Sequence, residues 1–514
     1  MALLSSSNPG RISRGGSFTP VIDPNASIKT DKNARGLFID TINVDPGDSL
    51  SPEDQKTLDD FNWEARIEAE NASRHKVTAN GNAQLDGNGN CVFGGVNGSY
   101  LDIPSSVDFD NDVDCTIEMY VYNRVNRDND APGAPGSALQ IGRMGPAGGL
   151  DIRMAFGTDS NGNISYYWYD GSTNFIRGTA TVPLNTWTHI ALSINATTAR
   201  LFIDGVMDVK GTVTNLIPND LQLILGQSQD DTDIDSYSGD LSRVIYSKGI
   251  GRYGADTSFT PPARTDEIAD DEYTVLALDF AGTAASQRII DLAKPENGGG
   301  VPIIPDISGN EIDAEQSVVV SQSIFDPSNT SLTPDGGDDF YSMDQDSFND
   351  QDFTIFVVAR WDSTPSGNGP YTLTNQNEYA YGGWRLGIDA TNRKIKFNTS
   401  ENNGNNQHEL LSIDAYNTDS DYHVVTIRKE QGGDLQMWVD STLQQTIPSS
   451  VDVAYTGMLN GTDIFYPQIS RWGVLQSPNR YSDSPWNGIL YRNVVIPDSD
   501  RAEIEQLLIE KYGV

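Results

Sequence analysis

The chain has very little cysteine and few positively charged residues. Cys91 and Cys115 are its only cysteines, which is too few for a scaffold held together by disulfides. Both fall in strand-like segments, and we expect two buried free thiols rather than a bridge. Lys and Arg number 34 against 72 Asp and Glu, so the formal net charge is −38. Such an excess argues against a nucleic-acid partner and against binding to an anionic membrane surface.

Long apolar runs and helix-forming stretches are also scarce. No run approaches the roughly 18 apolar residues that a membrane-spanning helix needs, so we expect no membrane insertion. The apolar stretch in the N-terminal sequence MALLSSSNPGRISRGG is too short for a signal peptide, so we expect no export by that route. Hydrophobic residues make up 37% of the 514 residues, and Gly, Asn, Asp, Ser and Thr are abundant. This composition favours an all-β, turn-rich protein, and the length favours two or three domains.

The clearest pattern in the chain is LNTWTHIALSINATTARLFIDG, residues 184–205. Apolar side chains alternate with polar or small ones over 189–194, and the alternation resumes over 201–204 after a polar turn. Alternation with a period of two on both sides of a turn is typical of an antiparallel hairpin with one buried face. Asp204 and Gly205 then supply the next tight turn.

Several motifs follow one another in a fixed order between residues 87 and 262. They are GNGNCVFGGVNGSYLDIP, DCTIEMYVY, NTWTHIAL, LFIDG, LILG and SGDLSRVIYSKGIGRYGADTSFTPP. Their order and spacing closely resemble the laminin-G-like, concanavalin A-like jelly-roll domain, in particular the version found in phage tail-fibre and other virion structural proteins. The resemblance implies two antiparallel sheets packed face to face.

The second half of the chain repeats parts of the first at a nearly constant separation. DFTI at 352–355 matches DCTI at 114–117, HVV at 423–425 matches HIA at 189–191, and VDS at 439–441 matches IDG at 203–205. These matches indicate a diverged duplicate. The duplicate has Asp421 where the first copy has Trp187, and Ser441 in place of Gly205.

We therefore expect five parts along the chain. They are an extended assembly arm at 1–50, a helix at 51–73, a laminin-G-like sandwich at 74–264, a linker with one strand at 265–300, and a second sandwich at 301–514. The helix is indicated by Ser51-Pro52-Glu53-Asp54, which places a capping residue, a proline and acids in their preferred positions. The second sandwich should end in a helix from Arg501 to Lys511 with one apolar stripe.

The arm at 1–50 lacks the hydrophobic periodicity to build a core of its own, and its first 35 residues carry a net positive charge. We expect it to be held by a neighbouring subunit, and the alternative is that it folds back on its own body. The candidate assembly residues are Arg11, Arg14, Lys29, Lys32 and Arg35.

The sequence offers few candidate catalytic residues. Glycoside hydrolysis needs two facing carboxylates, which enzymes of this fold carry in a tight E-x-D-x-E run, and the chain has no such run. Glu118 stands alone, and we expect it to face solvent. His189 and His423 fall at matching strand positions where the family carries a structural histidine. Motifs of serine hydrolases, P-loop proteins and zinc proteases are also missing, so we expect no enzymatic activity.

Calcium is the one cofactor that the sequence suggests, although none is required. Acidic residues alternate or crowd in DFDNDVD and QDDTDID, and hard oxygen ligands suit Ca²⁺. The alternative is a pair of solvated acidic loops. The candidate ligands are Asp108, Asp110, Asp112, Asp230, Asp231 and Asp233.

Sugar binding would need exposed aromatic side chains. On one strand Tyr166 and Trp168 share a face and Tyr167 and Tyr169 share the other, so one pair must point away from the core. The alternative is that these rings lie in the core or in a subunit interface. The candidate glycan-binding residues are Tyr166, Trp168, Tyr379, Tyr381 and Trp384.

Three classes of function remain. We favour a non-enzymatic virion structural protein of a phage, made in the host cytoplasm: a tail, fibre, appendage or capsid decoration component. Its partners would be other virion subunits, further copies of itself and a host-surface glycan. A cellular carbohydrate-binding or adhesin protein is the alternative, and a glycoside hydrolase comes last because the paired carboxylates are missing.

Overall fold

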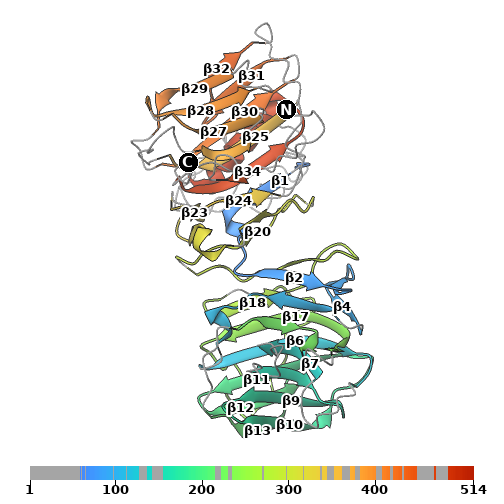
Figure 1. Cartoon of the computed structure of the whole chain (residues 1–514). Coiled ribbons are helices and arrows are strands. Elements are labelled where there is room, and N and C mark those ends of the chain that lie inside the picture. The colour runs from blue at the N-terminus through green and yellow to red at the C-terminus, as the bar shows by residue number, and fades with distance from the viewer. Residues whose placement is uncertain are drawn as a thin grey trace, which may run out of the picture. The chain divides into compact units, whose positions relative to one another are not determined.

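The computed structural model describes most of the chain from residue 58 onward (Figure 1). It covers residues 58, 61–63 and 65–514, except for 96–97, 111–112, 127–135, 142–153, 215–220, 230–233, 269–270, 297, 309, 317, 336–338, 344–351, 362–370, 377–382, 390, 401–407, 417–420, 431–432, 449–467 and 470–483. The assembly arm and its five basic residues lie outside the described residues.

The chain divides into two compact parts. The first sandwich comprises Glu70–Pro305 and Asp313–Phe325, and the second comprises Asp306–Ile312, Asp326–Val514 and the described residues up to Ala69. These bounds differ from the predicted ones because the expected linker at 265–300 belongs to the first sandwich. Its strands β18 (Thr274–Leu278) and β19 (Arg288–Ile290) pair with strands β17 and β2 of that sandwich.

One sheet of the first sandwich, the hairpin sheet, contains the predicted hairpin. Its strand order is β13-β12-β11-β6-β17-β4-β3, and β18 also pairs with β17. Strands β12, β11, β6 and β17, which are neighbours in this order, are labelled in Figure 1. The bounds are β3 Gln84–Leu85, β4 Cys91–Gly94, β6 Cys115–Asn123, β11 Trp187–Asn195, β12 Thr198–Ile203, β13 Val206–Thr212 and β17 Ser238–Lys248.

The other sheet, the aromatic sheet, has the order β10-β9-β8-β7-β14-β5-β2-β19. Its strands are β2 Lys76–Asn80, β5 Tyr100–Ile103, β7 Gly136–Ile141, β8 Met154–Thr158, β9 Asn163–Tyr169, β10 Thr173–Thr181, β14 Leu223–Leu225 and β19. Smaller pairs are β15 (Gln227–Gln229) with β16 (Ile234–Ser236) and β20 (Ile303–Ile304) with β21 (Ala314–Glu315). Three short 3₁₀ turns are η2 (Ala69–Asn71), η3 (Val107–Phe109) and η4 (Val319–Ser321).

The core of the first sandwich lies between these two sheets. Cys91 and Cys115 are part of it, and both are free thiols, as predicted. Burial raises the pKa of both thiols, that of Cys115 to about 12. Both thiols therefore stay protonated near neutral pH, and a protonated thiol is a poor nucleophile.

The second sandwich repeats this design. One sheet contains β23-β34-β25-β30-β31-β32 in this order, with β1 also paired to β34, and the other contains β24-β33-β26-β27-β28-β29. The bounds are β1 Ala65–Glu68, β22 Ile324–Asp326, β23 Ser331–Thr333, β24 Tyr341–Met343, β25 Phe353–Ala359, β26 Tyr371–Gln376, β27 Gly383–Ile388, β28 Lys394–Ser400, β29 His408–Ala415, β30 His423–Lys429, β31 Leu435–Val439, β32 Thr442–Ile447, β33 Gln468–Ile469 and β34 Trp486–Arg492. The prediction of two antiparallel sandwiches is confirmed.

The matching turns of the two sandwiches reveal an error of one residue in the predicted alignment. Asp204 and Asp440 both have positive φ, 47° and 48°. The side chain of Asp204 accepts a hydrogen bond from the backbone N–H of His189, and Asp440 accepts one from Val424, each at 2.9 Å. His189 therefore corresponds to Val424, not to His423. Because side chains alternate along a strand, His423 lies on the opposite face from His189.

The predicted helix at 51–73 is wrong for its C-terminal part. Residues 65–68 form strand β1, which pairs antiparallel with β34 from Tyr491 to Gly488. Ala65, Arg66, Ile67 and Glu68 are all buried, so pairing with the sheet outweighs the helical spacing of the sequence.

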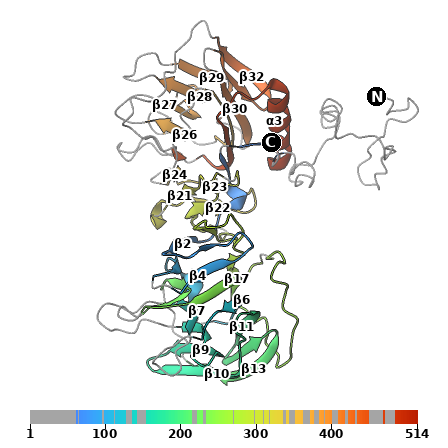
Figure 2. The same ribbon diagram turned by 90° about the vertical axis from the view of Figure 1, so that its right-hand side faces the viewer.

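The predicted C-terminal helix is confirmed as α3 (Asp498–Tyr512). It lies on the outer side of the sheet that contains β30 (Figure 2), where Ile504, Leu507 and Leu508 pack with Phe356. Lys511, at its basic end, forms an ion pair with buried Glu68 at 2.9 Å. Within the described part of the chain, no helix is long and apolar enough to cross a membrane.

The outer face of the hairpin sheet is covered differently. Residues 249–266, here called the strap, return across it after β17. Tyr253 and Phe259 of the strap stack with ring centroids 3.6 Å apart, and both contact Phe202 of the sheet. Gly205 is required here, because its φ is 74° and a Cβ would lie 2.0 Å from the carbonyl oxygen of Phe259. The closing motif that carried the family resemblance thus forms the cover of this sheet.

Side chains cap the backbone of an edge strand in both sandwiches. At the edge of the aromatic sheet, the N–H groups of Thr179 and Ala180 donate to the carboxylate of Asp208 on β13. In the second sandwich, the N–H groups of Leu411 and Ile413 on β29 donate to Gln445 and Gln444 on β32, each at 2.8 Å. Because of these hydrogen bonds, the N–H groups of Thr179, Ala180, Leu411 and Ile413 already have acceptors.

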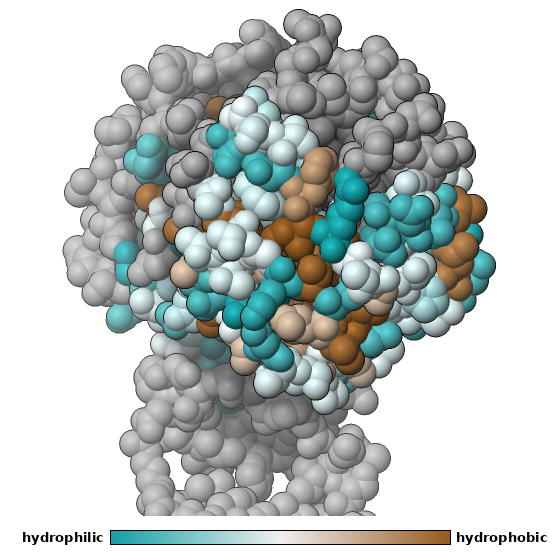
Figure 3. Space-filling view, turned by 90° about the horizontal axis from the view of Figure 1, so that it is seen from below, coloured by the Kyte–Doolittle hydropathy of each residue, from teal (hydrophilic) through white to brown (hydrophobic). Residues whose placement is uncertain are grey.

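Seen from the end where β10 and β13 lie, hydrophobic side chains gather in the middle of the face, with hydrophilic ones around them (Figure 3).

Candidate functional site

Strand β9 turns Tyr166 and Trp168 toward the core and Tyr167 and Tyr169 away from it. Tyr166 and Trp168 are 0% and 5% exposed and stack on each other in the core of the first sandwich. The prediction that these two rings bind a glycan is therefore wrong. Alternation shows that the two pairs point in opposite directions, but only the packing of the second sheet decides which pair it covers.

The outward pair, Tyr167 and Tyr169, belongs to an aromatic row that the sequence did not single out as a site. Tyr167 pairs across the strands with Phe175 of β10, and their ring centroids are 5.3 Å apart at 57°. The guanidinium of Arg177, two residues further along β10, lies 5.0 Å from the centre of the Phe175 ring. Tyr169 and Phe175 are half-buried and Arg177 is exposed, so the row reaches the surface of the sheet. We call Tyr167, Tyr169, Phe175 and Arg177 the outward aromatic row.

Small residues lie beside this row. Ser165 pairs with Arg177 on one side and with Gly157 of β8 on the other, and Ala155 pairs with Tyr167. The hydroxyl of Ser165 is buried and has no hydrogen-bond partner. A buried hydroxyl without a partner costs roughly 1–3 kcal/mol, part of which a buried water molecule can recover. Ser165 and Tyr167 are 0% and 7% exposed, so only Tyr169, Phe175 and Arg177 of this region reach the surface.

The second sandwich lacks this row at the equivalent positions. On β28, Ile395 and Phe397 face the core, and Lys396 and Asn398 occupy the alternate positions. Asn398 pairs with Glu409 as Tyr167 pairs with Phe175, and the carboxylate of Glu409 lies 2.6 Å from the ammonium group of Lys396. The two sandwiches therefore share a scaffold but differ in this surface.

The other predicted glycan residues fall in the second sandwich. Trp384 is 1% exposed and packs between Phe353 and Phe397, so the prediction that it stacks on a sugar is wrong. Tyr379 and Tyr381 lie outside the described residues.

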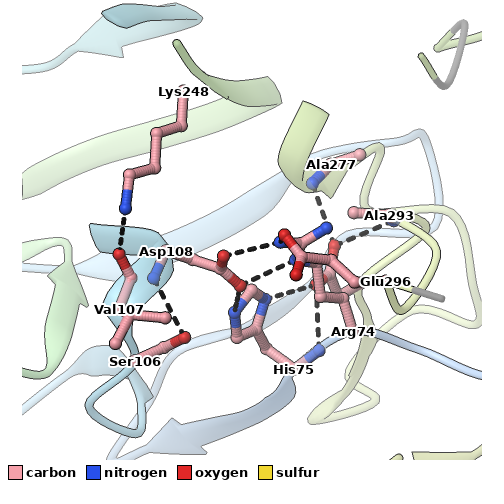
Figure 4. A network of polar contacts seen from close by, with 10 residues as sticks. Arg74, His75, Ser106, Val107, Asp108, Lys248, Ala277, Ala293 and Glu296 are labelled. Atoms are coloured by element: carbon pink, nitrogen blue, oxygen red, sulfur yellow. Dashed lines mark hydrogen bonds and ion pairs between the residues drawn. The ribbon is translucent and has the colours of Figure 1, made fainter. Parts of the chain in front are cut away.

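Asp108, a predicted calcium ligand, is instead engaged in a buried polar network (Figure 4). Its carboxylate accepts hydrogen bonds from Arg74 at 2.6 and 2.7 Å and lies 3.0 Å from Nε2 of His75. Nδ1 of His75 lies 2.9 Å from Asp291. Because both oxygens of Asp108 are already bound by cationic groups, this residue is not available to a cation, and the prediction is wrong for it.

The same network shifts the ionisation of its members. Burial alone lowers the pKa of His75, but the hydrogen bonds and charges of Asp108 and Asp291 outweigh it and raise the pKa. Burial raises the pKa of Asp108, but Arg74 and His75 outweigh it and hold that pKa well below its usual range. The network therefore consists of charged side chains that connect Asp108 of η3 with Arg74 and His75, just before β2, and with Asp291, just after β19.

The remaining calcium candidates give no site in the described residues. Asp110 is described, whereas Asp112, Asp230, Asp231 and Asp233 lie outside the described residues. Among the residues that the structure describes, no three His, Cys, Asp or Glu side chains are grouped so as to hold a metal ion.

Glu118 is buried, which corrects the prediction that it faces solvent. It does point away from the core, but the strap covers it: Tyr253 donates a hydrogen bond to it at 2.6 Å, and Nε2 of His189 lies 3.3 Å away. Burial raises its pKa, but these two partners outweigh burial and lower it. Glu118 is thus an ionised anchor for the strap that covers it.

A family comparison agrees with this architecture. Residues 93–248, which lie within the first sandwich, match the family model of the concanavalin A-like lectin/glucanases superfamily. The first sandwich has a concanavalin A-like fold. No curated protein sequence matches the chain.

Several solved structures are similar at low identity. The binding domain of botulinum neurotoxin DC, in complex with rat synaptotagmin II, is 16% identical, with 40% of this chain and 49% of that chain covered and a TM-score of 0.30. The mouse laminin alpha1 chain, domains LG4-5, is 12% identical over 80% of this chain and 87% of that one, with a TM-score of 0.25. Domain 4 of an extracellular arabinanase from Geobacillus stearothermophilus, in complex with arabinotriose, is 16% identical over 37% and 93%, with a TM-score of 0.27. The chain spans about half the length of the botulinum neurotoxin binding domain.

Proposed function

We propose that this chain is a non-enzymatic structural protein of a phage particle that attaches to a host-surface glycan. It would serve as a tail, fibre, appendage or capsid decoration component. The observation that carries the binding role is the outward aromatic row on β9 and β10, which the duplicated sandwich does not repeat. The matched superfamily is described as including lectins, which is in keeping with a sugar ligand.

The assignment to a particle rests on other features. The motif order of residues 87–262 resembles that of virion proteins, and the duplicated sandwich is a scaffold suited to repeated assembly. The basic arm supports an assembly role, because a strongly acidic body in a neighbouring copy would attract it. A cellular carbohydrate-binding or adhesin protein remains the alternative, since it would use the same surface.

Catalysis is not part of the proposal. The acid at the centre of the hairpin sheet, Glu118, is bound to Tyr253 and His189 beneath the strap. If the proposal holds, purified protein releases no reducing ends from polysaccharides. Release that disappears in Glu118→Gln would show instead that the strap opens over an active carboxylate.

Particle fractionation tests the assignment. An antibody against the full-length protein should label purified phage particles by electron microscopy, and mass spectrometry should find the chain among the particle proteins in many copies. Recovery of the chain only from host cells, with none in purified particles, would favour the cellular adhesin.

A further inference from the structure

We infer that residues 37–40 of the arm, Leu-Phe-Ile-Asp, dock on the first sandwich of a neighbouring copy, at one end of the outer face of the hairpin sheet. Trp187 and Tyr122 receive the apolar side chains there, and Arg264 receives the carboxylate of Asp40. This inference rests on the proposed function, because it names the surface that holds the assembly arm.

The strap leaves one cross-strand row of the hairpin sheet incompletely covered. His189, in a row beneath the strap, is 2% exposed. The next row contains Trp187, Tyr122 and Val92, which are all half-buried. Leu184, which forms a bridge to the last residue of β6, is 41% exposed. The outer face of this sheet therefore ends in an apolar surface that the described residues cover only in part.

Aromatic rings and guanidinium groups stack on this surface. The ring centroids of Tyr122 and Trp187 are 5.5 Å apart. The guanidinium of Arg264 lies 4.7 Å from the centre of the Trp187 ring, and that of Arg124 lies 5.7 Å from the centre of the Tyr122 ring. Trp, Tyr and Arg are the residue types that contribute most to binding at protein–protein interfaces. The composition therefore favours a protein segment as the occupant.

The charges on this surface favour an acidic occupant. Arg124 forms an ion pair with Asp240 at 2.7 Å. Arg264 donates to the neutral side chain of Asn90, and in the described part of the chain it forms no ion pair. A carboxylate docking beside Trp187 would accept charge-assisted hydrogen bonds from the remaining N–H groups of Arg264. The occupant should therefore carry an acid next to apolar side chains.

The last part of the arm has this composition. Residues 36–50, GLFIDTINVDPGDSL, contain three Asp and no Lys or Arg. Leu37, Phe38 and Ile39 directly precede Asp40. The surface row crosses β11, β6, β17 and β4, which is about 14 Å at roughly 4.8 Å between strands, and four or five extended residues span that length. The segment 37–40 thus matches the row in length, charge and apolar character.

The second sandwich shows how such a face is covered. Because His189 corresponds to Val424, Trp187 corresponds to Tyr422, two positions earlier on the strand. Tyr422 packs against the same apolar cluster as Phe61, and Trp63 is a buried member of that cluster. Residues 61–63 follow the arm in the sequence, so an aromatic segment from the N-terminal part of the chain covers this face in the second sandwich. We expect a segment of the same kind to cover the equivalent face in the first.

Cross-linking tests the position of the segment. A photoreactive phenylalanine analogue is placed at position 38 of the full-length protein, which is mixed with isotopically labelled wild type and allowed to exchange subunits. After irradiation, mass spectrometry should find position 38 of one copy joined to segments of another copy that contain Tyr122, Trp187 or Arg264. The matched control carries the analogue at position 18, in the same arm but outside 36–50, and should not label these segments.

Sedimentation velocity of full-length variants tests the contacts. Phe38→Ala should weaken association about 30-fold, as removal of a central ring at an interface does, whereas Phe18→Ala should stay within about twofold of wild type. Asp40→Arg and Arg264→Asp should each weaken association, and the variant with both changes should regain most of it because the two charges pair again. Phe38 and Asp40 lie outside both sandwiches, so their variants should keep the wild-type circular dichroism spectrum.

Four outcomes overturn the inference: no association of wild type, cross-links from position 38 only to other segments, cross-links only within one chain, or a double variant that associates no better than Asp40→Arg alone. Purified particles separate this inference from the proposed function. Protein that is present in particles but cross-links elsewhere refutes the inference alone, whereas wild-type protein missing from particles refutes the proposed function itself.

Discussion

Replacing Asp291 by Ala should strongly destabilise the first sandwich. Asp291 is 1% exposed, and its carboxylate accepts four hydrogen bonds. One comes from the ring of His75 and three come from the backbone N–H groups of His75, Ala277 and Ala293. His75 lies far from Ala277 and Ala293 in the sequence, so the carboxylate ties the segment before β2 to the segments around β18 and β19.

The size of the effect follows from the groups left behind. Asp291→Ala removes the acceptor for three buried backbone donors, each worth roughly 1–3 kcal/mol when unsatisfied, and leaves the His75 ring with Asp108 as its remaining acid. Water entering the cavity would recover part of this cost, so we expect a loss of about 3–5 kcal/mol. For a domain of this size that corresponds to a fall in melting temperature of roughly 6–20 °C.

Thermal unfolding followed by circular dichroism and calorimetry measures this loss. The control is Asp256→Ala, which removes an equally acidic side chain that is 43% exposed and pairs with Arg200 and Lys210 at the surface. The control should melt like wild type, because exposed pairs contribute little. If Asp291→Ala also melts within about 2 °C of wild type, the network does not hold the sandwich together, and the reasoning from buried donors is refuted.

Three further predictions concern His75, the strap and the arm. Since the pKa of His75 is raised in the folded protein, its charged ring stabilises the fold fully below about pH 6.5 and loses that effect as pH rises through the raised value. In urea unfolding, the free energies of unfolding of wild type and His75→Gln should therefore differ more at about pH 6 than at about pH 9. An equal difference at both pH values would contradict this. Gly205→Ala should cost about 2 kcal/mol or more, because a Cβ would lie 2.0 Å from the Phe259 carbonyl oxygen, and proteolysis within 249–266 should become faster; an unchanged cleavage rate would show that the turn tolerates a side chain. Deleting 1–50 should leave the melting temperature unchanged but abolish oligomerisation or entry into particles, and normal assembly of the truncated protein would rule out the arm as an assembly element.

Local patterns in the sequence predicted the hairpin and the duplication, and the family resemblance predicted the sandwiches. The hairpin at 184–205 was predicted because a period of two is set by the strand itself, and it appears as β11 and β12. The duplicate was recognisable because Asp204 and Asp440 occupy the same strained turn. What local pattern could not supply was register: the match of His423 to His189 was wrong by one residue, which moves a side chain to the other face.

The failures at single residues came from contacts over long distances in the sequence. Glu118 was expected in solvent, because nothing near it in the sequence indicates that residues 249–266 fold back over its strand. Residues 65–68 were expected in a helix, because their partner β34 lies far along the chain. Tyr166 and Tyr167 could be assigned to opposite faces but not to inside and outside, since only the second sheet distinguishes these.

The capped edges described above limit how copies of this chain can associate. A free strand edge offers the same backbone pattern to any other strand, so it permits open-ended growth of sheets. Asp208 in one sandwich, and Gln444 and Gln445 in the other, occupy N–H groups on which such growth would begin. Association at these edges then has to use side chains, whose shape and charge differ from place to place. Contacts of that kind depend on the particular side chains that meet, so open-ended growth of a sheet is disfavoured at these edges.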